Sequence, residues 1–203
     1  MSYHPSRMRR FLCKGQSGDE VSFRLAQSAD ADRMISWLRS DEAQRHIHWR
    51  PASPVHGRRR ITEWIKDPRG IVLLIVHRDK EVGFLQLEHL DNYRRMIWLS
   101  LIVLAPECIG KGIGTKALRL LMTRIHETDA IDRMLLAVNA DNARAIAAYR
   151  RLGFIVIDHH GRVPAHDGRN VAQNIMECAI RWHSPSRTPC YINRLYLPAH
   201  SSY

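Results

Sequence analysis

The chain has 203 residues, 45% of them hydrophobic and 25% charged, which is an ordinary balance for one globular domain with a full core. No apolar run approaches the ~20 residues that span a bilayer, and the basic N-terminus lacks the apolar stretch of a signal peptide. The four cysteines are scattered and form no CxxC pair, which argues against a zinc ribbon or a disulfide framework. We therefore expect a cytoplasmic protein without a membrane segment.

The formal net charge is +11, which suits nucleic acid, an anionic surface or an anionic small molecule. The densest basic run is "GRRR" at 57–60, and the other cationic residues are dispersed along the chain. Nucleic acid is therefore a possible but disfavoured partner. A multiply phosphorylated cofactor would also be attracted by the positive charge.

Taken in chain order, residues 1–20 are predicted to be a flexible basic lead-in. Residues 21–28 alternate like a strand, and apolar spacing predicts helices over 31–38 and near 58–66. Three apolar runs separated by short polar turns then predict an antiparallel meander between residues 71 and 106.

The second half of the chain alternates between helices and strands. A glycine-rich turn is followed by an amphipathic helix through Ile125, and the remaining elements are a strand over 133–140, a helix over 142–152, and strands over 154–159 and 173–182. The fold class is α/β with a mixed sheet (mixed α+β), in a single domain over 21–183 with an irregular tail over 184–203.

The turn before the amphipathic helix reads "IGKGIGT" over residues 109–115. It fails both the P-loop and the dinucleotide fingerprints, since Thr115 stands where each requires a glycine. Glycines that open a helix nonetheless turn backbone N–H groups toward one point, which suits a pyrophosphate. The alternative is a simple turn from strand to helix.

A second pattern lies in "VNADNARAIAAYRRLGF", residues 138–154. Asn142, Ala145 and Tyr149 are spaced i, i+3, i+7, so they share one face of a helix. The alternative interpretation makes Asn142 a helix cap and Tyr149 a packing anchor.

Together the two segments resemble the GCN5-related N-acetyltransferases (GNAT), with a [Q/R]-x-x-G-x-[G/A] pyrophosphate loop followed by N-x-x-A-x-x-x-Y-x-x-x-G-F. The resemblance implies one GNAT-like domain whose mostly antiparallel mixed sheet, flanked by helices, splays to admit acetyl-CoA as co-substrate. It implies that backbone groups around Ile102 pair with pantetheine, that the loop amides hold the pyrophosphate, that Asn142 lies along the cofactor, and that Tyr149 stands near the thioester sulfur. The cofactor-binding residues that it implies are Ile102, Val103, Leu104, Ile109, Gly110, Lys111, Gly112, Ile113, Gly114, Thr115, Asn142 and Ala145.

One residue departs from the family pattern. Ile109 occupies the Q/R position, so Lys111 or a nearby arginine would have to replace the missing polar side chain, or CoA would bind more weakly.

Transfer of an acetyl group to an amine needs a deprotonated amine, a polarised carbonyl and a protonated leaving thiolate. An alkylamine has a pKa of roughly 10.4, so a general base is required. Glu88 is our candidate base and Tyr149 our candidate general acid. Ser100 occupies the region where the aminoglycoside 6'-acetyltransferase branch, which the chain resembles, carries an aspartate; a serine there cannot act as a base unaided.

The segment "WLRSDEAQRHIHW" resembles the acceptor-contacting helices of the RimJ/RimL-like and aminoglycoside branches, which implies that Trp37, His46, His48 and Trp49 line the acceptor site. We expect no metal, because no carboxylate or cysteine completes a ligand set around the histidines.

The predicted function is acetyl-CoA-dependent N-acetylation of a primary amine, carried by an amino sugar, an aminoglycoside-like small molecule or a protein N-terminus. The alternative is a non-catalytic GNAT-fold module that binds an acidic partner or RNA. We expect a monomer or a homodimer.

Overall fold

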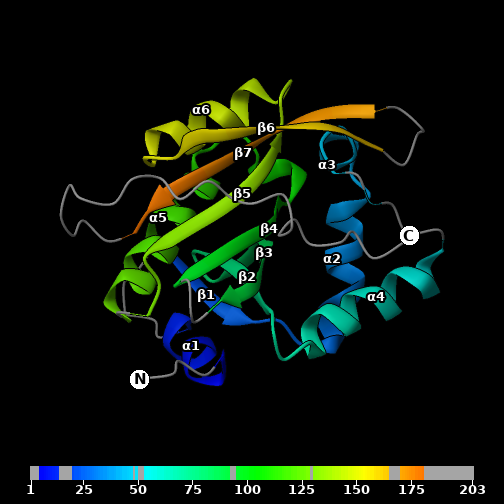
Figure 1. The fold of residues 1–203 in the computed structure, drawn as a ribbon. Coiled ribbons are helices and arrows are strands. Elements are labelled where there is room, and N and C mark those ends of the chain that lie inside the picture. The colour runs from blue at the N-terminus through cyan, green and yellow to red at the C-terminus, as the bar shows by residue number, and fades with distance from the viewer. Residues whose placement is uncertain are drawn as a thin grey trace.

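The computed structural model describes residues 5–13, 20–47, 49, 53–91, 95–128, 130–164 and 170–180. Within them, seven strands form one sheet in the order β1-β2-β3-β4-β5-β7-β6, in which β4 and β5 are the one parallel pair (Figure 1). The strands are β1 Val21–Leu25, β2 Ile71–His77, β3 Lys80–Asp91, β4 Met96–Leu104, β5 Arg133–Asn139, β6 Ile155–Pro164 and β7 Asn170–Ala179. The predicted α/β fold class with a mixed, mostly antiparallel sheet is confirmed.

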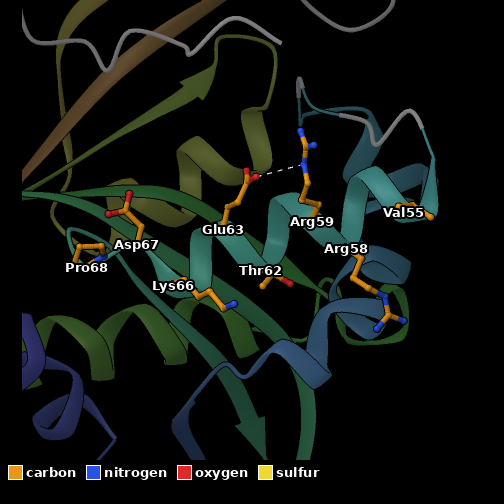
Figure 2. A pocket seen from close by; sticks show the side chains of 8 residues that line it. All are labelled: Val55, Arg58, Arg59, Thr62, Glu63, Lys66, Asp67 and Pro68. Carbon is orange, nitrogen blue, oxygen red and sulfur yellow. Dashed lines mark ion pairs between the residues drawn. The ribbon is translucent and has the colours of Figure 1, made fainter.

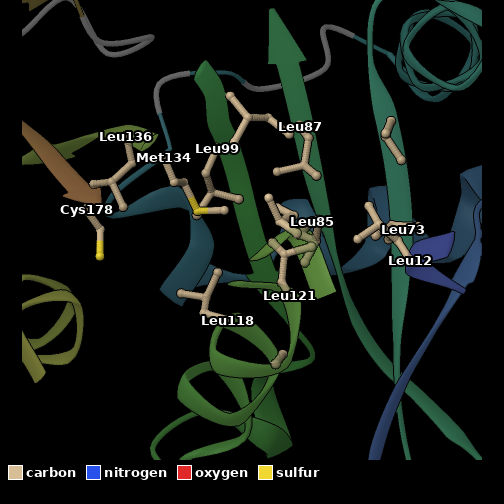
Figure 3. Packing of buried hydrophobic residues seen from close by; sticks show 14 of the residues in the cluster. Leu12, Leu73, Leu85, Leu87, Leu99, Leu118, Leu121, Met134, Leu136 and Cys178 are labelled. Carbon is tan, nitrogen blue, oxygen red and sulfur yellow. The ribbon is translucent and has the colours of Figure 1, made fainter. Parts of the chain in front are cut away.

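Helices cover both faces of this sheet. They are α1 Pro5–Leu12, α2 Ala31–Leu38, α3 Asp41–Gln44, α4 Pro54–Lys66, α5 Ile113–Glu127 and α6 Ala143–Arg151, with 3-10 turns at Ser28–Asp30 and Pro106–Cys108. The larger apolar core joins α1, α5 and α6 to one face; Figure 3 shows Leu118 and Leu121 of α5 against strand residues such as Leu99. On the other face, α2 and α4 pack over β2, β3 and β4.

The predicted flexible lead-in is wrong for residues 5–12, which form α1. Met8 and Leu12 lie one turn apart and are both fully buried in the larger core. The Arg9 guanidinium donates to the backbone carbonyls of Asp67, at 2.7 Å, and Gly70, at 2.6 Å. An eight-residue helix is marginal by itself, so these tertiary contacts decide its formation.

Two further differences lie between β1 and β2. The short helix α3 was not predicted, and its start is capped by Ser40, whose hydroxyl accepts from Ala43 N at 3.3 Å. Helix α4 begins four residues before the predicted position, because Ser53 caps it and Pro54 fits the first helical turn. The predicted tail over 184–203 lies outside the described residues.

Candidate active site

The parallel strands β4 and β5 pair over only part of their length. Met96 to Leu99 lie opposite Arg133 to Leu136, and no pairing joins the described residues of the two strands beyond that point. On its other side β4 has a bulge, because Gln86 of β3 faces Leu101 while Leu87 faces Leu99. A bulge bends its strand and increases the local twist. The opening between Ser100–Leu104 and Ala137–Asn139 is called the strand gap below.

The β4 edge of the strand gap includes three of the predicted cofactor residues. Ile102, Val103 and Leu104 pair with β3 on one side and have no ladder partner in β5. Successive residues of a strand direct their N–H and C=O groups to opposite edges, so part of this backbone faces the strand gap. An extended ligand could pair with it as an added strand.

The glycine loop follows β4 and leads into α5 (Figure 1). Gly110 has φ 79° and Gly112 φ 76°, which is left-handed backbone, and a Cβ at either position would meet nothing within 4 Å. Gly112 is the N-cap of α5, and no side chain caps this end. The N–H groups of Ile113, Gly114 and Thr115 have no backbone partner among the described residues, so they are available to an anion.

Two of the three α6 motif residues have roles in holding the helix itself. Asn142 Oδ1 accepts from Ala145 N at 3.1 Å and so caps α6, while Ala145 packs against the larger core. The Tyr149 ring, partly accessible, packs on Phe154 with centroids 5.7 Å apart. Burial raises the pKa of the Tyr149 phenol to about 12, so the hydroxyl keeps its proton at neutral pH.

The strand gap, the glycine loop and the tyrosine-bearing helix lie in one continuous stretch of the chain, from β4 to α6. A sequence model described as the acetyltransferase (GNAT) domain matches residues 20–155. The chain belongs to the GNAT acetyltransferase domain family.

Similar proteins include mycothiol acetyltransferase of Corynebacterium efficiens, at 32% identity over 130 residues. That match covers 61% of this chain and 41% of the relative, so the matched part spans about two fifths of that protein's length.

Solved structures confirm the predicted GNAT fold. The spermidine N-acetyltransferase of Vibrio cholerae, solved with CoA and spermine, has a TM-score of 0.71 at 16% identity, covering 80% of this chain and 96% of that one. An acetyltransferase of Salmonella typhimurium that modifies the N-terminal serine of ribosomal protein L7/L12 has a TM-score of 0.71 at 18% identity, covering 81% and 97%.

The loop of this GNAT domain carries Ile109 where the family pattern has a polar residue. Ile109 is extended backbone and half-buried, and the side chain of Lys111, two residues on, is exposed. Lys116, in the first turn of α5, is paired with Glu20 at 2.6 Å. Of these two lysines, only Lys116 is held in an ion pair among the described residues.

The two candidate catalytic residues of the sheet lie beside the apex of the strand gap, which is the point where the pairing of β4 with β5 ends. Glu88 of β3 pairs with Trp98 of β4, next to the pair of Leu87 with Leu99 that adjoins the bulge. Its Oε1 accepts a hydrogen bond from Gln86 Nε2. Ser100 is the bulged residue itself, and its Oγ is buried without a hydrogen-bond partner among the described residues.

The predicted acceptor residues divide into two groups. Trp37 and Trp49 are buried in the apolar layer under α2 and α4. Trp37 stacks on Phe84 with ring centroids 6.5 Å apart, and Trp49 packs on Trp64 with ring centroids 5.2 Å apart. Packing alone accounts for both rings. His46 is half-buried, and its Nδ1 has no partner among the described residues. His48 lies outside the described residues.

Asn139 was missed by the sequence analysis. It closes the apolar strand β5, is 3% exposed, and donates through Nδ2 to the carbonyl of His46 at 3.3 Å. The available signal was a lone amide at the end of the buried run "RMLLAVN".

A separate groove runs along the outer face of α4 and is lined by Arg58, Arg59, Glu63, Lys66 and their neighbours (Figure 2). Arg59 is paired there with Glu63, and Arg58 with Asp32. This groove lies away from the strand gap, and its arginines are partly neutralised.

Two properties concern the described residues as a whole. None of their helices is long and apolar enough to cross a membrane. Their His, Cys, Asp and Glu side chains form no group of three that could hold a metal ion.

Proposed function

We propose that this GNAT domain is an acetyl-CoA-dependent N-acetyltransferase in which a primary amine attacks the thioester directly. The observation that carries the proposal is the continuity of three features: the unpaired edge of β4, the open glycine loop and the uncapped start of α5. An extended, phosphorylated thiol ester matches all three in order.

The residues present fit acetyl-CoA. The free amides of Ile113, Gly114 and Thr115 would hold its pyrophosphate at the positive end of α5. The backbone between Ile102 and Leu104 would pair with its pantetheine arm. When bound, acetyl-CoA supplies the activated acetyl group.

Glu88 is the proposed base. It lies beside the apex on the strand face that carries Phe84 and Gln86, which is the face covered by α2 and α4, because side chains alternate along β3. An amine that approaches from this face would meet the carboxylate, directly or through water, before it reaches the strand gap. Ser100 Oγ, buried at the bulge, could hold such a water.

Tyr149 is the proposed acid. Helix α6 packs on the same core as α5, so the phenol lies on the cofactor side of the sheet. The phenol is protonated at neutral pH, as an ordinary tyrosine is, so its proton is available to a departing thiolate. Burial raises the pKa of the phenol to about 12, which favours a donated hydrogen bond over full ionisation.

The acceptor is inferred only as a class. The similar enzymes act on spermidine or on a ribosomal protein N-terminus, as their names state. The net charge of +11 disfavours a polycation and favours an amine that is phosphorylated or belongs to a protein N-terminus near RNA.

Two measurements test the proposal. Acetyl-CoA at a hundred times Kd should stabilise the protein by about 2.7 kcal/mol, seen as a rise in Tm. A panel of amines, including spermine, amino sugars, phosphorylated amino sugars and peptides with free N-termini, should then give one that releases CoA thiol. No thermal shift at millimolar acetyl-CoA would contradict the proposal, and salt-sensitive RNA binding without any transfer would favour the non-catalytic alternative.

A further inference from the structure

The short segment after α2 spans the strand gap. Glu42, on α3, pairs with Arg144 on α6, and the carbonyl of His46 accepts from Asn139 Nδ2 at the end of β5, at 3.3 Å. In its middle the segment is tied back to α2, because Gln44 Nε2 donates to the Leu38 carbonyl at 2.6 Å. The segment Asp41–Ile47, called the clasp below, therefore connects the β1–β4 half of the molecule to the β5–β7 half.

Asn139 is built into the second half rather than into the clasp. It lies opposite Gln173 in the β5–β7 ladder, and its Oδ1 accepts from Gln173 Nε2 at 3.3 Å. Because side chains alternate along β5, Asn139 shares a face with Leu135 and Ala137, while Leu136 and Val138 face the core that contains α5. The clasp thus crosses on the face opposite α5.

The clasp also carries polar atoms that the described residues leave unsatisfied. Gln44 Oε1 and His46 Nδ1 are both buried without a hydrogen-bond partner, as is Ser100 Oγ at the apex. Buried polar atoms are normally hydrogen-bonded, so atoms in this position suit a polar ligand or ordered water.

We propose that Asn139 is a positioning residue that docks the clasp across the strand gap, so that the amine binds against His46 on the face opposite the cofactor. The acceptor part rests on the proposed function; the docking part does not. Loss of the Asn139–His46 bond would free the clasp and weaken amine binding, whereas the glycine loop, on the other side of the sheet, would keep its hold on acetyl-CoA.

The test uses three variants of the full chain. Asn139→Asp removes the Nδ2 donor at constant volume and keeps the acceptor for Gln173. Arg144→Ala removes the ion pair between the clasp and α6. Arg45→Ala is the matched control, since Arg45 also pairs with Glu42, at 2.9 Å, but within the clasp itself.

Amide deuterium uptake over residues 41–47 is measured first, with no turnover required. We expect faster uptake in Asn139→Asp and Arg144→Ala and unchanged uptake in Arg45→Ala. Acetyl-CoA Kd should stay within about twofold, while KM for the best acceptor among spermine, a phosphorylated amino sugar and an N-terminal-serine peptide should rise roughly three- to tenfold for Asn139→Asp.

The outcomes separate the two proposals. Unchanged uptake in both Asn139→Asp and Arg144→Ala overturns the docking role, whatever the kinetics show. Increased uptake with an equal loss of acetyl-CoA affinity overturns the acceptor role, because the clasp would then support the cofactor. A wild-type protein that acetylates no amine contradicts the proposed function, while the uptake result still decides the docking of the clasp.

Discussion

Tyr149 offers the sharpest test of chemistry at the scale of one residue. Tyr149→Phe keeps the ring that packs on Phe154 and removes the proton that the phenol can donate. If that proton goes to the leaving thiolate, kcat should fall roughly 10²–10⁴-fold, with little change in acetyl-CoA Kd. Steady-state kinetics on the acetylated amine check this, and an unchanged kcat would leave Tyr149 as a packing anchor.

The pH dependence of stability gives a second test of Tyr149. Burial raises the pKa of the phenol to about 12, against roughly 10 in an unfolded chain, so between these pH values the unfolded chain loses the proton more readily and the folded state becomes less stable. The stability that the protonated Tyr149 phenol contributes is complete below about pH 10 and is lost as pH rises toward 12. The free energy of unfolding, measured in urea, should therefore fall less between pH 8 and pH 11 in Tyr149→Phe than in the wild type.

Gly112 tests the glycine loop at the same scale. Gly112→Ala forces a side chain into left-handed backbone, at a cost of about 1–2 kcal/mol, and places a methyl group in the open space of the loop. We expect acetyl-CoA Kd, measured by calorimetry, to rise at least roughly tenfold.

Gly153→Ala is the matched control for that substitution. Gly153 also has a positive φ, of 92°, but it ends α6 and lies beside Cys178 rather than in the loop. It should reproduce the loss of stability without the loss of affinity; equal affinity losses in both variants would argue against an anion site in the loop.

At the scale of elements, α1 should belong to the cooperative core although it precedes the family match at residue 20. Leu12 is fully buried and its carbonyl accepts from Arg124 of α5. Leu12→Ala should lower the free energy of unfolding by about 2–5 kcal/mol, measured by urea denaturation. Arg10→Ala, on the exposed side of α1, should change it by less than about 0.5 kcal/mol. Equal effects would mean that α1 does not pack as described.

At the scale of the whole molecule, the charge of +11 should bias the choice of acceptor. A phosphorylated amino sugar should show a higher kcat/KM than its unphosphorylated form, with an advantage that shrinks as ionic strength rises from 0.01 to 0.15 M, where the Debye length falls from about 30 to about 8 Å. Steady-state kinetics at the two ionic strengths measure these kcat/KM values. A kcat/KM for spermine above that for the phosphorylated amino sugar at both ionic strengths would contradict the prediction.

Much of this architecture follows from local sequence signals. Apolar runs separated by short polar turns determined the meander of β2, β3 and β4, and period-3.6 spacing determined α2, α5 and α6. The left-handed turns at Gly110 and Gly112 could be expected because glycine adopts that backbone without a Cβ penalty. The face shared by Ala145 and Tyr149 needed nothing beyond helical geometry.

The tertiary structure alone decided how these elements combine. Where β4 leaves β5 depends on the bulge at Ser100, a two-strand register that no single segment encodes. The α1 helix forms because α5 and the sheet bury Met8 and Leu12, and the partnership of Asn139 with His46 joins residues 93 positions apart. Local periodicity shows which face of a helix or strand is apolar, whereas contacts between distant segments depend on how all the elements pack together. The sequence by itself therefore determined the individual helices and strands, and their packing determined the arrangement of the site.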